Sequence, residues 1–194
     1  MSKKNLRNMI GYGANGKKIT WPHNAKLALQ IVLNYEEGAE NCVLNGDKYS
    51  ETFLSEIISA KAIKGRHISM ESIYEYGSRA GFWRLDKLFK EKKVPVTIFG
   101  VGLALKQNPE VCEAIKKGNY EVAAHGYRWI DYQDVKKTVE KKHMLDAIKV
   151  IKDIFGSRPL GWYTGRCSPN TRDLVFDEGG FLYDSDSYSD DLPY

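Results

Sequence analysis

The sequence has no long hydrophobic run. Hydrophobic residues make up 42% of its 194 residues, enough for a core. However, the longest apolar stretches, at 27–33 and 94–105, are broken by polar residues or glycines. Both fall short of the ~20 residues that a membrane helix needs. No apolar segment follows the basic first residues, as a secretory signal would require. We therefore expect a cytoplasmic protein without a membrane partner.

Disulfide, metal and nucleic-acid patterns are also missing. The three cysteines are odd in number and form no C-x-x-C pair, which favours reduced thiols. The four histidines show no H-x-x-x-H spacing. Few ligands are thus available for a catalytic metal, and we expect neither a metal nor another cofactor. The net charge of +4 is spread along the chain, so no basic block indicates nucleic acid as a partner.

Short apolar runs alternate with amphipathic segments along the chain. The runs predict buried strands, and the segments between them, several with capping residues and a terminal glycine, predict helices. Strands are expected at 26–34, 94–101, 120–125, 159–164 and 181–184, and helices at 69–92, 109–118, 134–155 and 168–180. This alternation indicates parallel β–α units. We treat residues 1–194 as a single domain, or as an incomplete piece of a larger one.

Two of these helices allow finer predictions. Ser69 is expected to cap the first helix. In the helix at 134–155, the spacing directs Val139, Leu145 and Ile151 toward the core. The polar stretch at 38–66 is long for a loop in a compact domain, which indicates a substrate-covering loop. Glu51 and Arg66 are weak candidates for contacts with substrate from this loop.

Chemically capable side chains recur just after the predicted strands. Right-handed crossovers bring the carboxyl ends of parallel strands to one edge, where α/β enzymes build their sites. This rule selects Glu36, Glu37, Gly100, His125, the segment Tyr163–Arg166, and the segment Asp184–Asp186.

Glu36 and Glu37 follow the first strand directly. Two close carboxylates repel each other, which raises the pKa of one of them and suits a general base. The alternative is an ordinary solvated pair in a loop. His125 ends the third strand, where an imidazole can transfer a proton or hold a metal; the alternative is a hydrogen-bonded structural histidine.

The fourth strand is followed by Tyr163 and Arg166, which offer a hydroxyl donor and a planar fork of N–H donors. Cys167, beside Arg166, is a weaker candidate for an activated thiol, because no histidine is placed to deprotonate it. Asp186 lies in a D-x-D sequence that matches only part of a calcium loop.

Taken in order, these motifs resemble the polysaccharide deacetylase superfamily, whose NodB-homology fold is an incomplete (β/α) barrel. Within it, the chain is most similar to the allantoinase-like branch that works without a metal. The resemblance covers most of the chain and is most specific at Ile31–Gly38, Met70–Leu85, Val94–Val101, Glu121–Trp129, Arg158–Arg172 and Gly179–Tyr194.

The resemblance implies roles for individual residues. In the deacetylases, a T-F-D-D-G motif supplies the base and a metal ligand, and Glu36 and Glu37 occupy the matching positions here. The H-x-x-x-H motif supplies two further ligands; His125 matches the first, but Trp129 replaces the second, and an indole N–H cannot bind a metal. At most two of three ligand positions therefore remain, below the usual three protein ligands of catalytic zinc.

The implied function is hydrolysis of a C–N bond in a cyclic amide, with water activated without a metal. Glu36 and His125 are the expected catalytic residues. Substrate binding is expected from Glu37, Trp129, Tyr163, Arg166 and Asp186. Two alternatives stay open: a divalent-metal N-deacetylase that acts on N-acetylated sugars, and an inactive remnant.

Members of the superfamily continue beyond the position of Tyr194. The resemblance therefore implies the N-terminal part of the family domain, with about five β–α units present. It leaves a homo-oligomer or a complementing C-terminal fragment open as partners.

Overall fold

The computed structural model describes residues 7–194. The described chain divides into two compact units, residues 7–29 with 187–194, and Gln30–Asp186. Within the first unit, the Tyr12 N–H donates to Asp190 and the Tyr12 hydroxyl donates to the carbonyl of Pro193. The second unit contains the sheet and the helices that pack on it. The single domain expected over 1–194 stays a prediction.

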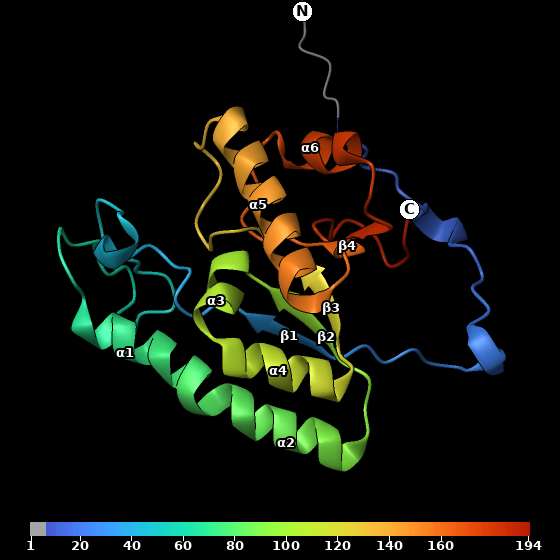
Figure 1. The fold of residues 1–194 in the computed structure, drawn as a ribbon. Coiled ribbons are helices and arrows are strands. Elements are labelled where there is room, and N and C mark those ends of the chain that lie inside the picture. Colours follow the sequence, from blue (N-terminus) through green and yellow to red (C-terminus); the bar gives the residue numbers. More distant parts are fainter. Residues whose placement is uncertain (1–6) are drawn as a thin grey trace, which may run out of the picture. The chain divides into compact units, whose positions relative to one another are not determined.

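The second unit is built on a parallel five-stranded sheet (Figure 1). Its strands are β1 (Val32–Tyr35), β2 (Thr97–Gly100), β3 (Glu121–Ala124), β4 (Gly161–Trp162) and β5 (Tyr183–Asp184). The spatial order β1-β2-β3-β4-β5 follows the order along the chain. Each strand therefore pairs with the next, as in part of a (β/α) barrel. The predicted α/β class with about five units is confirmed.

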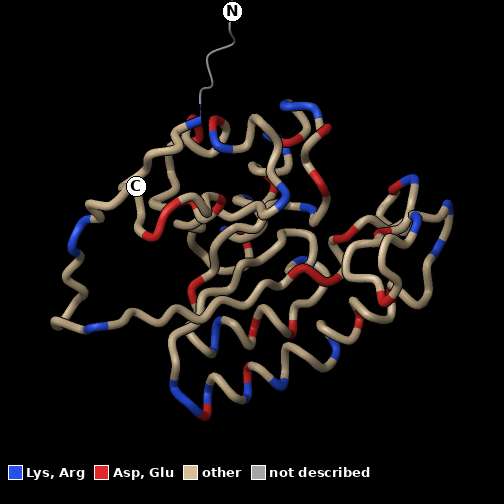
Figure 2. Tube along the Cα trace, turned by 180° about the vertical axis from the view of Figure 1, so that it is seen from behind, with Lys and Arg blue, Asp and Glu red and all other residues tan. Residues whose placement is uncertain are grey.

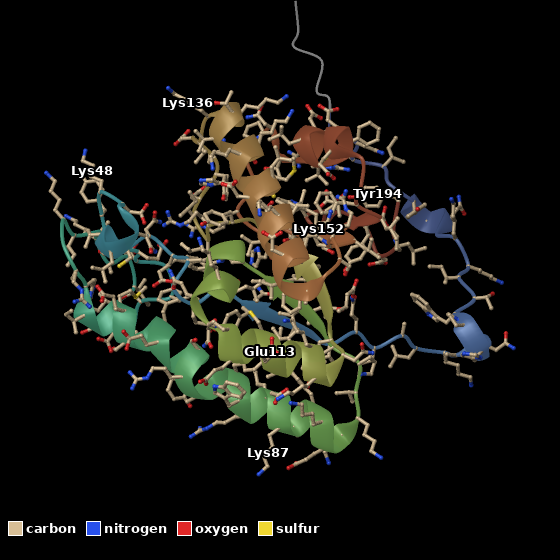
Figure 3. All side chains as sticks on the ribbon, in the orientation of Figure 1. Lys48, Lys87, Glu113, Lys136, Lys152 and Tyr194 are labelled. Atoms are coloured by element: carbon tan, nitrogen blue, oxygen red, sulfur yellow. The ribbon has the colours of Figure 1, made fainter. Side chains whose placement is uncertain are left out.

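Helices follow the strands in the order that the sequence predicts, with one addition. They are α1 (Ile68–Tyr76), α2 (Phe82–Lys92), α3 (Gly102–Gln107), α4 (Pro109–Gly118), α5 (Lys137–Phe155) and α6 (Thr171–Glu178). The short helix α3 was not predicted. Helices α2, α4 and α5 pack in a row along one face of the sheet (Figure 1). Lys87, Glu113 and Lys152 point away from it, on the outer sides of these helices (Figure 3).

The helix predicted over 69–92 is interrupted by a π-helical segment, η4 (Gly77–Gly81). The expected cap is also wrong. His67 caps α1, because its Nδ1 accepts a hydrogen bond of 3.4 Å from the backbone N–H of Met70. The cap of α4 is as predicted: Asn108 Oδ1 accepts from Val111 N–H at 3.2 Å, and a proline follows in the first turn.

The inner face of α5 differs from the prediction. Ile151 is buried, but the Val139 and Leu145 side chains are 41% and 47% exposed. Glu140 is buried instead, because its carboxylate accepts hydrogen bonds from the Ser168 and Thr171 hydroxyls. A carboxylate can occupy a buried position in the core when both of its oxygens accept hydrogen bonds. This polar network therefore fixes the rotation of α5.

The first strand is shorter than the expected 26–34. Leu27 and Leu29 are 76% and 78% exposed and belong to the first unit, so the strand begins at Val32. The core lies between the sheet and the row of helices, where Ile98, Leu105 and Ile115 are fully buried.

Positive and negative residues are interspersed along the chain trace (Figure 2). Within residues 7–194, no helix is long and apolar enough to cross a membrane.

Candidate active site

The strand register brings the predicted residues to one edge of the sheet. Tyr35 pairs with Gly100, Gly100 with Ala124, Ala124 with Trp162, and Trp162 with Asp184. These are the last residues of the five strands. The positions that follow, including Glu36, His125 and Tyr163, therefore begin at the same level of the sheet, as the strand-end rule predicts.

His125 lies between two oxygen atoms. Its Nε2 is 3.0 Å from Glu36 Oε1, and its Nδ1 is 3.2 Å from the backbone oxygen of Tyr163. The His125 side chain is 2% exposed and that of Glu36 is 15% exposed. The imidazole is therefore held by the residues that follow β1 and β4, on either side of its own strand β3, and the carboxylate is the more exposed member of the pair.

The contact with Tyr163 orients the imidazole. A carbonyl oxygen only accepts, so the His125 Nδ1 atom acts as the donor in this contact. The ring is thereby held with Nε2 directed at the Glu36 carboxylate.

Glu37 points away from this pair. Its Oε2 accepts a hydrogen bond of 3.1 Å from the backbone N–H of Glu36, and its side chain packs against Gly77 of η4. Burial raises the pKa of the Glu37 carboxyl, and the negative charges of Glu36 and Glu40 add to the effect. A raised pKa in the adjacent pair is thus confirmed in direction. However, burial of the Glu37 carboxyl, and not repulsion between the two carboxylates, is the main cause.

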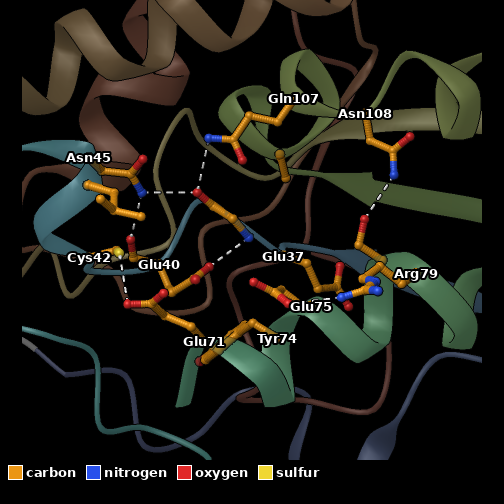
Figure 4. Close-up of a pocket in the computed structure, with 14 residues that line it drawn as sticks. Glu37, Glu40, Cys42, Asn45, Glu71, Tyr74, Glu75, Arg79, Gln107 and Asn108 are labelled. Atoms are coloured by element: carbon orange, nitrogen blue, oxygen red, sulfur yellow. Dashed lines mark hydrogen bonds and ion pairs between the residues drawn. The ribbon is translucent and has the colours of Figure 1, made fainter. Parts of the chain in front are cut away.

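The side chain of Glu37 lines a pocket of about 300 Å³ (Figure 4). The pocket lies between the turn after β1, helix α1 with η4, and the end of α3. Its walls are polar and carry more acidic than basic groups, with Glu40, Glu71, Glu75, Arg79, Asn45, Gln107 and Asn108 among the lining residues. Neither Glu36 nor His125 lines this pocket. The side chains of Glu36 and Glu37 therefore face different parts of the site.

We expect Gly77→Ala to disturb the site. A Cβ at Gly77 would lie 2.0 Å from Glu37 Oε1 and 2.9 Å from its Cγ, so the whole side chain must move. That movement breaks its bond to the Glu36 backbone. Overpacking of this kind costs about 1–3 kcal/mol, and urea unfolding measures it.

The matched control is Gly81→Ala in the same π-helical segment. There the nearest atom would lie at 3.8 Å, an ordinary contact, and the higher helix propensity of alanine favours stability by up to ~1 kcal/mol. Equal unfolding free energies for the Gly77 and Gly81 variants would contradict the close fit of Glu37.

A second group of side chains surrounds Trp129, which is 6% exposed. The rings of Phe53 and Tyr74 lie 5.6 and 5.8 Å from its ring. The guanidinium carbon of Arg166 lies 5.0 Å from the indole centroid, a cation–π distance. Phe53 comes from the long loop expected to cover the substrate, and Trp129 and Arg166 follow β3 and β4, so three segments meet here.

The two groups are electrostatically linked through Tyr74. Burial raises the pKa of its hydroxyl, the charges of Glu51, Glu40 and Glu36 raise it further, and Arg166 lowers it. Glu36 and Arg166 thus both act on the same hydroxyl. The carboxylate of one group and the guanidinium of the other therefore flank a common region.

The remaining candidates after β4 and β5 take different positions. The Tyr163 ring packs at a tilt against both Phe99 and His125, with centroid distances of 4.9 and 4.8 Å. Asp186 accepts hydrogen bonds of 2.8 and 2.7 Å from the backbone N–H groups of Thr164 and Gly165. Its carboxylate thus shapes the turn that follows Tyr163. A direct contact between Asp186 and substrate stays a prediction.

The activated thiol is not supported. Burial raises the pKa of the Cys167 thiol to about 12, and the charge of Asp186 adds to the effect. A nucleophilic cysteine needs a lowered pKa, so this alternative is wrong.

Two residues of the site were missed or underrated from sequence. Arg128 donates to the backbone oxygens of Ala39 and Glu40 and pairs with Asp47, which fastens the turn after β1 to the turn after β3. Its position one residue before Trp129 was the only available signal. Glu51, a weak candidate from sequence, is 5% exposed and contacts Arg166. Arg66 pairs with Glu71 instead.

The residues present do not fit the metal site of the deacetylases. Of the three matching positions, Glu37 is turned toward Gly77, both ring nitrogens of His125 are engaged, and Trp129 has no lone pair to offer. No group of three or more His, Cys, Asp or Glu residues within 7–194 is placed to hold a metal ion. The donor set therefore falls below what catalytic zinc requires.

Comparisons with known proteins identify the family of this chain. The polysaccharide deacetylase family profile matches residues 64–174. A curated Schizosaccharomyces pombe (strain 972) protein, named for the polysaccharide deacetylases, is 43% identical over 183 residues, which cover 90% of this chain and 57% of that protein.

Two solved structures are more similar still. A probable polysaccharide deacetylase from Pseudomonas aeruginosa PAO1 is 58% identical, with a TM-score of 0.94 over 98% of this chain and 64% of that one. The PuuE allantoinase is 55% identical, with a TM-score of 0.95 over 99% of this chain and 64% of that one. The chain thus spans less than two thirds of the length of these relatives. On the profile match and on these identities, the chain belongs to the polysaccharide deacetylase family.

Proposed function

We propose that this protein hydrolyses a C–N bond in a cyclic amide of the allantoin type, and that it does so without a metal. The observation that carries the proposal is the pairing of Glu36 with His125, whose second nitrogen is bound to a backbone oxygen. This leaves an open carboxylate beside a buried imidazole, with an indole where the deacetylases need a ligand. The similarity to a solved allantoinase supports the same branch.

In the proposed reaction, Glu36 is the general base. His125 holds one carboxylate oxygen of Glu36 in place, and the other carboxylate oxygen takes a proton from water. The water oxygen bonds to the ring carbonyl carbon, and the carbonyl electrons move onto oxygen. When the oxyanion collapses, the C–N bond breaks and the proton on Glu36 passes to the ring nitrogen. The product is the ring-opened carboxylic acid.

The oxyanion needs donors, because no metal is invoked to polarise the carbonyl. Arg166 is the strongest candidate, since its guanidinium is always charged and 24% of its side chain is exposed. Loss of one oxyanion donor typically costs about 10²–10³-fold in rate. The Tyr163 ring, which packs at a tilt against His125, supplies an aromatic surface against which a flat substrate ring can pack.

The second candidate function is a divalent-metal N-deacetylase, favoured by the family profile. The misfit of Glu37, His125 and Trp129 to a metal site argues against it. An inactive remnant is the third candidate. One assay distinguishes the three: the purified 194-residue chain is incubated with allantoin and with N-acetylglucosamine oligomers, each with zinc or with a chelator.

We expect ring opening of allantoin at the same rate with zinc and with chelator, and no deacetylation. Ring opening that a chelator stops and zinc restores would overturn the metal-free reaction. Zinc-dependent release of acetate would support the deacetylase. Turnover of neither substrate by a folded chain would overturn the proposed activity for this polypeptide. The Glu36→Gln variant supplies the background rate.

A further inference from the structure

Glu51 lies in the long loop at 38–66, outside the strand ends, yet its carboxylate is buried. Its Oε1 accepts from the backbone N–H groups of Thr52 at 2.9 Å and Phe53 at 3.0 Å, and its Oε2 accepts from Asn41 Nδ2 at 2.8 Å. Burial alone would raise the pKa of Glu51. These hydrogen bonds and the charge of Arg166 outweigh it and hold that pKa below its usual range. The loop therefore presents a fixed negative charge.

The Glu51 carboxylate lies next to the guanidinium of Arg166. Arg166 Nη1 lies 3.4 Å from Glu51 Oε2, and the guanidinium carbon lies 5.5 Å from the Phe53 ring and 5.0 Å from the Trp129 ring. Two aromatic rings and one carboxylate thus restrain a side chain that otherwise has many rotamers. The guanidinium has five N–H donors, and among residues 7–194 one of them reaches a carboxylate, that of Glu51, so further donors can serve a ligand.

We propose that Glu51 is a positioning residue, which holds the Arg166 guanidinium over the Trp129 ring before the substrate arrives. This inference rests on the proposed function, and it assigns the loop at 38–66 an active role in that site. A donor oriented in advance needs no rearrangement when charge develops on the carbonyl oxygen. With Arg166 held in this way, the site favours a substrate with a flat ring whose carbonyl oxygen lies within reach of the guanidinium.

A double-mutant cycle tests the proposal in the 194-residue chain. Glu51→Gln keeps the shape of the side chain but removes its charge. It should lower kcat/KM for ring opening by about ten- to hundredfold, as is typical when the partner that orients an active-site ligand is lost. Arg166→Met should lower kcat/KM at least as much. Because Glu51 acts through Arg166, the double variant should be no slower than Arg166→Met alone.

The matched control is Glu178→Gln. Glu178 belongs to another carboxylate–arginine pair, with Arg158, and its side chain is also largely buried, at 14% exposed. It should leave kcat/KM unchanged. If Glu51→Gln causes the same fold loss in the wild-type and Arg166→Met backgrounds, Glu51 only stabilises the loop and the proposal is overturned.

A second readout requires no turnover. The indole N–H signal of Trp129, assigned with Trp129→Phe, reports the cation above the ring in ¹H–¹⁵N NMR spectra. We expect Glu51→Gln to shift this signal and Glu178→Gln not to. With Arg166→Met already present, Glu51→Gln should add no shift. If the signal does not move in Glu51→Gln, Glu51 does not position Arg166 and the proposal is refuted. This result is independent of whether allantoin is the substrate.

Discussion

Replacing Glu36 with glutamine should lower kcat for ring opening by about 10²–10⁴-fold, the usual contribution of a general base. The amide has nearly the same size as the carboxylate, so the 3.0 Å contact with His125 Nε2 can persist. However, an amide oxygen does not take a proton from water at neutral pH. The fold should therefore survive while the chemical step fails, which steady-state kinetics and circular dichroism measure together.

Glu91→Gln is the matched control for this experiment. It makes the same change at a glutamate on α2 whose side chain is 57% exposed and lies outside the pocket that Glu37 lines. We expect its kcat to equal that of the wild type. If Glu36→Gln retains kcat to within about threefold, another group accepts the proton and the assignment of Glu36 is wrong.

Replacing Trp129 with histidine restores the H-x-x-x-H spacing in the sequence, yet it should not create a zinc site. Of the other matching ligands, Glu37 is held against Gly77 and His125 is held by two oxygen atoms. The variant should instead lose about 2–4 kcal/mol of unfolding free energy, since a large buried ring is replaced by a smaller polar one. Urea unfolding with and without zinc measures both effects.

Trp83→His on α2 controls for the new imidazole alone. Trp83 is half-buried and packs against Phe82 and the core. A ligand that binds only the folded state raises its stability by RT ln(1 + [L]/Kd). We therefore expect zinc to change the unfolding free energies of the two variants equally. Selective stabilisation of Trp129→His by micromolar zinc would show that Glu37 and His125 can turn to bind a metal.

The sequence was sufficient to predict the edge of the sheet that carries the site. Strand ends are predictable because each buried run stops where polar residues begin, and parallel strands align those stops. Glu36, His125 and Tyr163 were placed in this way, and the register confirms their common level. Periodicity was less informative for α5. Apolar residues occur on two of its faces, and the buried Glu140 decides which one turns inward.

The contacts of the loop at 38–66 could not be predicted. Glu51 and Arg166 are 115 positions apart, and no local sequence pattern predicts their contact. The same holds for Glu37 and Gly77, whose fit depends on a π-helical segment that looks like ordinary helix in the sequence. Such contacts depend on tertiary packing, which single-sequence propensities do not contain.

The oxygen that orients His125 is a main-chain atom of residue 163. Every amino acid supplies the same oxygen at that position, so evolutionary drift of the side chain there preserves the tautomer of the imidazole. Sequence motifs that compare side chains among distant homologues therefore do not reveal the hydrogen bond between His125 and this main-chain oxygen. A one-residue insertion between β4 and residue 163 would abolish this hydrogen bond without changing any catalytic residue.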